Sequence, residues 1–142
     1  NFTPEEQHTM LTLWCLFGSP LMLGCELTKL DDATLALLTN RDVLSMLTPD
    51  CKPHQVCLDD EKAIWCAHNA VTGEHFAAFF NLSDETQTIH CDIETLHVGD
   101  EPCAHKDASL TELWSKEKTS VSGSAISVTP PAHGCLVFRV EN

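Results

Sequence analysis

The sequence is poor in basic residues, and this shortage argues against two classes of partner. Its 142 residues contain 8 Lys and Arg against 21 Asp and Glu, so the net charge is −13 when the histidines are neutral. Nucleic acids and anionic membrane surfaces both attract Lys and Arg. We therefore expect no nucleic-acid partner and no membrane partner. A neutral or small polar ligand fits this charge, although acidity alone selects no substrate.

Long apolar runs and targeting signals are also missing. No apolar run reaches the roughly 18–20 residues that a membrane-spanning helix needs. Residues 1–12 contain Glu5 and Glu6 and lack the basic start of a signal peptide. Asn1 is not a natural initiator, so we expect the true N-terminus to lie upstream, together with any targeting signal.

Eight cysteines leave two redox readings open. An even number suits disulfides in a secreted domain. Several of these cysteines, however, lie in apolar runs such as residues 13–16 and 134–137, where a free cysteine serves as a small core residue. This placement favours reduced thiols and a cytoplasmic over a secreted location.

The first 17 residues predict an amphipathic helix. Thr3 can cap it, Pro4 suits its first position, and Glu6 can complete a capping box. Gly18 is expected to end the helix. The residues predicted to face inward follow the helical spacing at Met10, Leu13, Trp14 and Phe17, and Leu11 and Cys15 widen this face.

Residues 21–23 predict a short strand that is apolar throughout. Such a strand is usually covered on both faces, as in a parallel sheet surrounded by helices. No second strand of this kind follows, which indicates that residues 1–50 are the end of something larger. A second helix should begin at Asp31 or Asp32, point Leu35 and Leu38 inward, and close at a left-handed Asn40, before further helical turns at residues 41–47.

A change of period near residue 50 marks a predicted domain boundary. Residues 48–53 are rich in turn formers and are expected to be a connection. Beyond them apolar residues alternate with a period of two, which predicts an antiparallel β-sandwich over residues 51–142. The expected strands lie at residues 62–68, 75–81, 86–93, 110–114, 125–129 and 135–140, with a hairpin turn at 69–74.

Two stretches in the first half resemble a known family. They are residues 14–27, WCLFGSPLMLGCEL, and residues 37–44, LLTNRDVL. Both resemble the end of the catalytic barrel in melibiase-type α-galactosidases (glycoside hydrolase family 27). The second half has landmarks similar to that family's C-terminal sandwich, in the same order: Ile64-Trp65, Gly73, Phe79-Phe80-Asn81, Glu112-Leu113-Trp114 and residues 130–134.

This resemblance implies an α/β remnant, the last helix–strand–helix of a (β/α)8 barrel in residues 1–50, followed by an all-β antiparallel sandwich in residues 51–142. Family members hydrolyse terminal α-galactosides with retention, using two aspartates about 5–5.5 Å apart. Both family aspartates precede the matched region, so no catalytic residue is assigned in this chain. The parent enzyme would take an oligosaccharide through its barrel without a cofactor, and the fragment alone should be inactive.

Cys25 and Glu26 mark a departure from the family pattern. They stand where the family has Asn-Asp after the glycine of the last barrel strand. The carboxyl end of a barrel strand is where active-site residues sit, so these two residues are candidates for a position next to the substrate. The purely structural alternative is that Cys25 is a buried thiol and Glu26 a helix-capping or surface carboxylate.

A zinc module is the alternative metal reading. Cys51, His54 and Cys57 are spaced at intervals of three, and Cys66 and His68 follow nearby. Thiolates and imidazoles at short spacing can bind Zn²⁺ tetrahedrally. The pattern lacks a paired Cys-x-x-Cys, so linker residues and core thiols are the simpler reading.

A non-catalytic carbohydrate-binding sandwich is the remaining alternative function. Trp14, Trp65 and Trp114 could stack on sugar rings. Trp14 and Trp65 lie in apolar patterns and are expected in the core, whereas the placement of Trp114 at a strand end leaves its role open.

Overall fold

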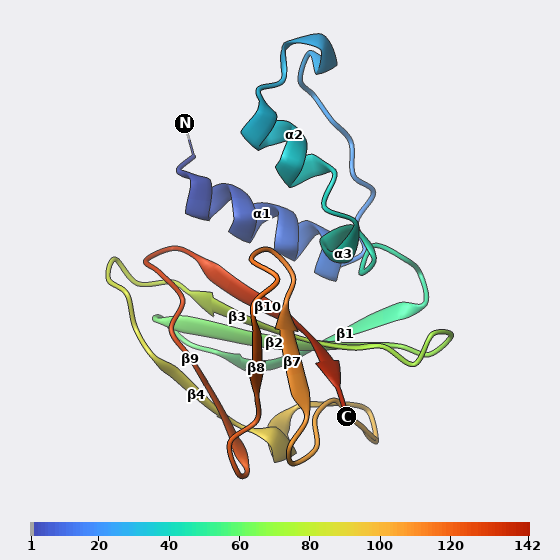
Figure 1. The fold of residues 1–142 in the computed structure, drawn as a ribbon, viewed down its shortest axis with the longest axis vertical. Coiled ribbons are helices and arrows are strands. Elements are labelled where there is room, and N and C mark those ends of the chain that lie inside the picture. Colours follow the sequence, from blue (N-terminus) through green and yellow to red (C-terminus); the bar gives the residue numbers. More distant parts are fainter. Residues whose placement is uncertain (1) are drawn as a thin grey trace.

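The alternating apolar residues of the second half form a sheet that other elements cover on both faces (Figure 1). The structure is a computed structural model and describes residues 2–142. In these residues the largest sheet has the strand order β1-β2-β3-β10-β7-β8, and every neighbouring pair is antiparallel. Its strands are β1 (Cys51–Leu58), β2 (Lys62–Asn69), β3 (His75–Asn81), β7 (Ser109–Glu112), β8 (Lys118–Ser120) and β10 (Cys135–Glu141).

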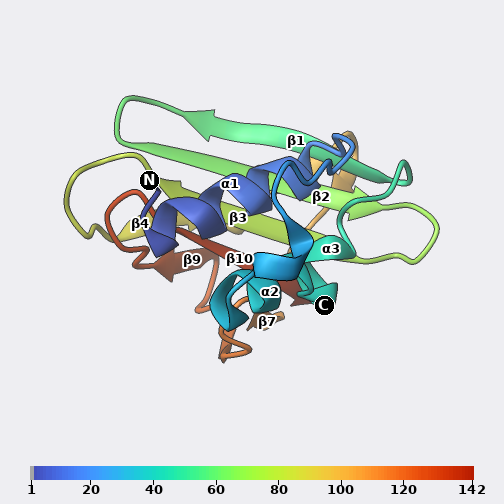
Figure 2. The same cartoon turned by 90° about the horizontal axis from the view of Figure 1, so that it is seen from above.

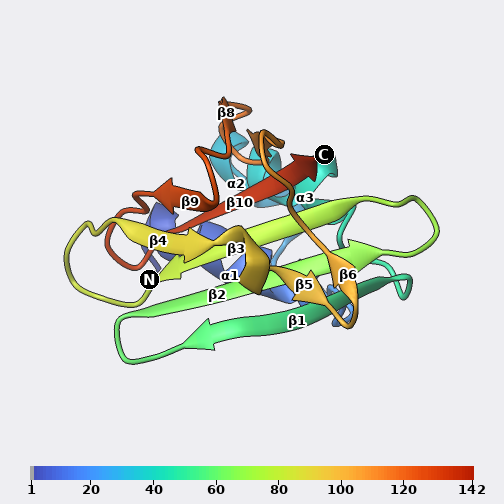
Figure 3. The same ribbon diagram turned by 90° about the horizontal axis from the view of Figure 1, so that it is seen from below.

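Two small sheets cover one face of the large sheet, and helices cover the other (Figures 2 and 3). The small sheets pair β4 (Ile89–Asp92) with β9 (Ala125–Val128), and β5 (His97–Val98) with β6 (Glu101–Pro102). The helical elements are α1 (Pro4–Leu16), η1 (Leu27–Lys29), α2 (Asp32–Leu38), α3 (Arg41–Leu44) and η2 (Ile93–Thr95). The expected antiparallel sandwich is therefore present.

Strand β3 shows why the molecule has two cores. All seven of its residues are buried, because alternate side chains enter opposite layers. Phe76, Ala78 and Phe80 belong to the core under the helices, whereas Ala77 and Phe79 belong to the core under the small sheets. The strand predicted at residues 75–81 is confirmed, and Phe76, Ala78 and Phe80 share one of its faces. A strand covered on both faces loses the apolar–polar pattern of a half-exposed strand.

The N-terminal helix begins as its sequence predicts. Thr3 and Glu6 form the capping box in both directions, and Pro4 is the first helical residue. Gly18 has φ of 65° just after the helix, a conformation that glycine adopts without the Cβ clash of other residues.

The face that α1 buries overlaps only in part with the predicted face. Met10, Trp14 and Phe17 are 41%, 36% and 47% exposed. The buried side chains are Leu11 and Cys15, which were predicted at the margin of the inward face, together with Thr12 and Leu16. Apolar residues surround much of α1, so helical spacing alone could not select the face that contacts the sheet.

The strand predicted at residues 21–23 is wrong for this chain. This segment has no regular secondary structure, Met22 is 82% exposed and Leu23 is 45% exposed. A strand forms only where a neighbour pairs its backbone groups, and the described residues offer none here. Of the expected helix–strand–helix, only the helices form.

The second helix is confirmed, but two details of it are wrong. Asp31 is its cap and accepts a hydrogen bond from the Thr34 amide at 2.7 Å. Leu35 is 48% exposed rather than buried. Asn40 is not left-handed, with φ of −67°, and its side chain caps α3 by accepting from the amides of Asp42 and Val43.

The connection predicted at residues 48–53 ends earlier than expected. Strand β1 begins at Cys51 and contains Pro53. Because β1 is an edge strand, a proline there need not interrupt a hydrogen-bond ladder on both sides. Strands β1, β5, β6 and β8 were not predicted; β1 has eight residues, and the other three have only two or three each.

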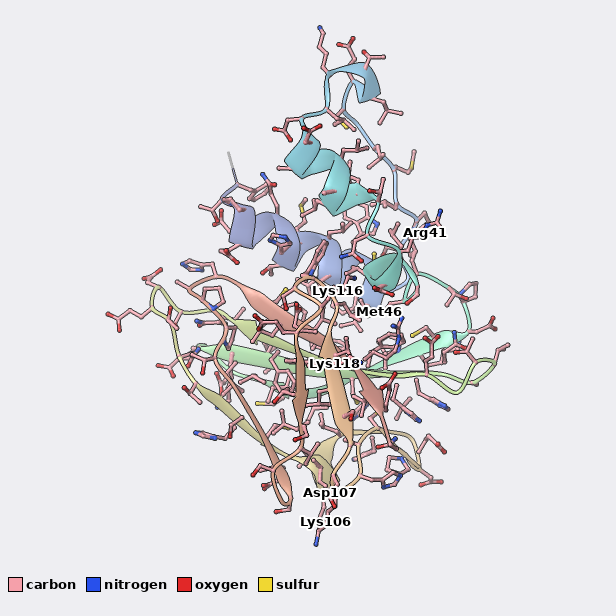
Figure 4. All side chains as sticks on the ribbon, in the orientation of Figure 1. Arg41, Met46, Lys106, Asp107, Lys116 and Lys118 are labelled. Atoms are coloured by element: carbon pink, nitrogen blue, oxygen red, sulfur yellow. The ribbon has the colours of Figure 1, made fainter. Side chains whose placement is uncertain are left out.

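Polar contacts fasten the helices to the sheet. The Trp114 indole donates to Thr12 Oγ1 at 2.9 Å, and the Lys116 ammonium pairs with Asp42 of α3. Figure 4 shows Lys116 at the β7–β8 turn, close to α3, and Met46 between α3 and the sheet. Met46 is fully buried, so α3 is anchored by packing as well as by charge. In residues 2–142 no helix combines the length and apolarity required to cross a bilayer.

Candidate functional site

An apolar cavity lies against α1, α2 and the segment between them. Its volume is about 310 Å³, and its lining is mostly hydrophobic. Met10, Trp14, Met22 and Leu23 line it while remaining at least 36% exposed. Apolar side chains that gather around an open cavity commonly mark an interaction surface or a binding groove.

Cys25 and Glu26 lie at the edge of this apolar region. Both are exposed, and Cys25 also lines the cavity. The Glu26 carboxylate accepts from Thr28 Oγ1 at 2.9 Å and pairs with Lys29 Nζ at 3.0 Å. These hydrogen bonds, from Lys29 first and then Thr28, lower the pKa of Glu26. The residues are therefore close to each other and open to solvent, and Glu26 is an ionised carboxylate at neutral pH.

The five residues of the alternative zinc pattern do not converge. Cys51 lies in the core under the helices, whereas Cys66 lies in the core on the other face of the sheet. The His54 ring stacks on His97 with centroids 5.3 Å apart. None of the eight cysteines, all of which lie in the described residues, forms a disulfide.

Burial raises the pKa of several cysteine thiols. It raises the pKa of Cys15 and of Cys135 to about 11. A hydrogen bond with Cys66, followed by burial, also raises the pKa of Cys103. These buried sulfurs remain protonated at neutral pH and are weak nucleophiles and weak metal ligands.

One pair of histidines comes together that the cysteine pattern did not indicate. His68 ends β2, His75 begins β3, and the two are cross-strand partners. Their rings stack with centroids 4.4 Å apart and an interplanar angle of 9°. One ligand atom each of His68, His75 and Glu101 lies within 4.8 Å of the others, and no other such group of three occurs in residues 2–142.

The surroundings of His75 disfavour its protonated, positively charged form. Burial, followed by the nearby His68, lowers the pKa of His75 below 6.5, and Glu101 opposes this shift. His75 Nδ1 is buried and has no hydrogen-bond partner. Of these three residues the sequence reading included only His68. The expected hairpin at residues 69–74 could have revealed His75, since it places residues 68 and 75 opposite each other.

The three tryptophans are half-buried rather than open stacking platforms. Trp14 donates through its indole to the Pro20 carbonyl at 2.8 Å, and Trp65 packs edge-on against Phe17 with ring centroids 4.8 Å apart. Trp114 meets the His8 ring edge-on at 4.5 Å. The prediction that Trp14 lies in the core is wrong, because it is 36% exposed.

Comparison with protein families identifies the second half of the chain. Residues 59–140 match the model described as the alpha galactosidase C-terminal beta sandwich domain. This match covers 82 of the 142 residues, more than half of the chain.

Curated relatives match nearly the whole chain. Alpha-galactosidase A of Cellvibrio japonicus is 25% identical over 148 aligned residues, which cover 99% of this chain and 36% of the relative. A protein named probable alpha-galactosidase D, from Aspergillus niger, is 25% identical over 99% of this chain and 22% of its own length. The chain thus spans about a third or less of these two relatives.

Solved structures reproduce the fold over the full chain. A GH27 β-L-arabinopyranosidase from Geobacillus stearothermophilus superimposes with a TM-score of 0.87 at 30% identity, covering 100% of this chain and 31% of that one. Alpha-galactosidase I from Mortierella vinacea gives a TM-score of 0.85 at 17% identity, with 98% and 36% covered, which shows the shared fold.

Proposed function

The chain belongs to the alpha galactosidase C-terminal β-sandwich family, as a C-terminal portion of a GH27-type enzyme, and from that premise we propose that the parent protein is a retaining glycoside hydrolase acting on terminal α-galactosides. The chemical step belongs to a barrel that would precede this chain. Two carboxyl groups about 5–5.5 Å apart would act there, one as nucleophile and one as general acid and base. In this proposal the catalytic aspartates lie outside residues 1–142, and no cofactor takes part.

Residues 1–50 are, in this proposal, the end of the catalytic barrel, and residues 51–142 the separate sandwich. The observation that carries it is the exposed apolar surface of the N-terminal segment. Soluble monomers rarely expose large contiguous apolar patches. Trp14 and Phe17 extend from α1, while Met22 and Leu23 come from the irregular segment after it. The remainder of a barrel would cover these side chains and give residues 21–23 a strand to pair with.

Cys25 and Glu26 are proposed to lie next to the sugar. They follow residues 21–23 directly, so pairing of that segment into a barrel would place them at its carboxyl end. Glu26 would then offer an ionised carboxylate to sugar hydroxyls. The same proposal assigns the protein to the cytoplasm, supported by eight cysteines without a disulfide, of which six are buried.

The test uses the chain together with its upstream reading frame. Expressed as one protein, it should hydrolyse 4-nitrophenyl α-D-galactopyranoside, and proton NMR should detect α-galactose as the first product. The β-L-arabinopyranoside must be assayed beside it, because a similar structure is described as a β-L-arabinopyranosidase. Preference for the arabinopyranoside would overturn the substrate class, and release of β-galactose from the α-galactoside would overturn the retaining mechanism.

Variants of Cys25 and Glu26 examine the proposed substrate position in the same protein. Cys25→Ser and Glu26→Gln should change KM or kcat at least about tenfold if the side chains contact the sugar, the loss expected for one or two hydrogen bonds. Glu5→Gln, at the exposed start of α1, is the matched control and should leave both constants unchanged. Unchanged kinetics in the first two variants would remove these residues from the site.

A non-catalytic carbohydrate-binding role makes a different prediction for the chain alone. Calorimetric titration of residues 1–142 with galactose and with raffinose should give no saturable heat under the proposed function. Saturable binding by this chain, without the upstream segment, would favour the carbohydrate-binding alternative.

A further inference from the structure

Two hairpins bring three metal-binding side chains to one end of the sandwich. The turn between β2 and β3 sets His68 opposite His75, and the β5–β6 hairpin supplies Glu101. Figure 3 shows β5 and β6 lying against β2 near the end where β2 turns into β3. Because these residues come from two separate hairpins, the fold, not sequence spacing, creates the cluster.

The His75 ring lacks the partners that a buried imidazole normally has. Nδ1 is buried with no hydrogen-bond partner in the described residues. Nε2 lies 3.9 Å from Glu101 Oε1, which is too long for a hydrogen bond. Neither ring nitrogen therefore has a hydrogen-bond partner among the described residues, and Nε2, which faces Glu101, is the one placed to bind an ion.

We propose that His68, His75 and Glu101 form a binding site for a divalent transition-metal ion, with Zn²⁺ the best-fitting ion. Two imidazoles and one carboxylate are an established ligand set for zinc, and a water molecule would complete the tetrahedron. The site differs from the alternative cysteine pattern, shares only His68 with it and uses no thiolate. It also stands apart from the glycosidase proposal, so either can fail without the other.

The distances are close to those that an ion requires. Tetrahedral Zn²⁺ with bonds of about 2.0–2.1 Å holds neighbouring ligand atoms about 3.4 Å apart. The three ligand atoms here lie within 4.8 Å of one another. The Glu101 side chain is 53% exposed and can rotate inward. The stacked rings, 9° apart in plane, would have to rotate out of their parallel arrangement so that both lone pairs point at one ion.

A solvent-accessible cavity gives an ion access to the site, and the Glu101 carboxylate supplies a negative charge. A cavity of about 500 Å³ between the β2–β3 turn and the end of β10 reaches His75, so solvent can deliver the metal. Arg139, the nearest guanidinium in that cavity, pairs with Glu74 at 3.0 Å. Glu101 has no cationic partner apart from His75 among the described residues, so its carboxylate is available to a cation.

The experiment titrates the purified chain with Zn²⁺ by calorimetry and with Co²⁺ by visible absorption. We expect one ion per chain and the ligand-field bands of four-coordinate cobalt with nitrogen and oxygen ligands. Glu101→Gln should weaken Zn²⁺ binding at least about 100-fold, since loss of an outer-shell partner alone costs 10–100-fold. Glu101 is exposed, so this variant should fold normally, which circular dichroism checks.

Matched variants separate this site from other metal binding. His68→Asn should weaken binding as Glu101→Gln does. His90 is an exposed histidine on β4, and the His90→Asn variant should bind Zn²⁺ as tightly as the unsubstituted chain. Intense near-ultraviolet charge transfer with Co²⁺ would reveal thiolate ligands and overturn the proposal. Absence of Zn²⁺ binding at 100-fold excess, or equal binding by the Glu101→Gln chain, would overturn it as well.

Discussion

Leu11 and Met10 are adjacent on α1 and test which face of this helix contacts the sheet. Leu11 is 2% exposed and belongs to the core that the helices share with the sheet, whereas Met10 is 41% exposed. Replacing a buried leucine by alanine costs about 2–5 kcal/mol, and we expect about 3 kcal/mol for Leu11→Ala because the neighbouring cavity allows partial collapse. Met10→Ala should cost at most about 1 kcal/mol, because much of the side chain is already in water and alanine favours the helix.

Urea unfolding of the chain measures this difference. With a slope of about 2 kcal/mol per molar urea, Leu11→Ala should lower the unfolding midpoint by about 1.5 M, and Met10→Ala by about 0.5 M or less. Equal slopes in the two variants are required for the comparison. The helical spacing in the sequence places both Met10 and Leu11 inward and so does not predict the small cost of Met10→Ala. A Met10→Ala shift as large as that of Leu11→Ala would refute the packing described here.

Three further perturbations follow from specific contacts. Asp42→Asn should lower the free energy of unfolding by about 0.5–1 kcal/mol, a value already reduced for solvent screening. The Lys116 ammonium lowers the pKa of Asp42 below 3.8, so this cost is fully present above about pH 4 and disappears as the pH falls through the folded pKa. Urea midpoints at pH 7 and pH 3 would show the difference. Gly134→Ala should cost about 1–3 kcal/mol, because the new Cβ would lie 2.6 Å from Pro131 Cγ; an unchanged melting temperature would contradict this contact. Cys25, the exposed thiol, should react with a disulfide reagent in the native chain far faster than the six buried thiols, and rapid release of more than two equivalents of thiolate would contradict the burial.

Local sequence signals predicted much of the fold because short-range chemistry determines those features. The capping box at Thr3 and Glu6 needs only residues three apart, and the structure contains it. The alternation of Phe76, Ala78 and Phe80 likewise specifies one face of β3. Strands and helix starts of this kind follow from propensity and period alone.

Features that depend on distant residues could not be predicted in the same way. The choice between the Met10 face and the Leu11 face of α1 depends on where the sheet lies, and both faces are apolar. Residues 21–23 carry the pattern of a buried strand but have no partner in the described residues. Glu101 joins His68 and His75 only because a second hairpin folds against β2, and no spacing in the sequence records that contact.

The glycosidase proposal has its most direct test in the purified chain alone. Residues 1–142 should release nitrophenol from 4-nitrophenyl α-D-galactopyranoside no faster than buffer, because the proposed catalytic aspartates are not among them. The sample must first show the native circular dichroism and cooperative urea unfolding, so that inactivity cannot reflect a misfolded chain. Turnover at about 1 s⁻¹ or more, within the ordinary range of enzymes, would contradict the account and place the reacting carboxylates within this chain.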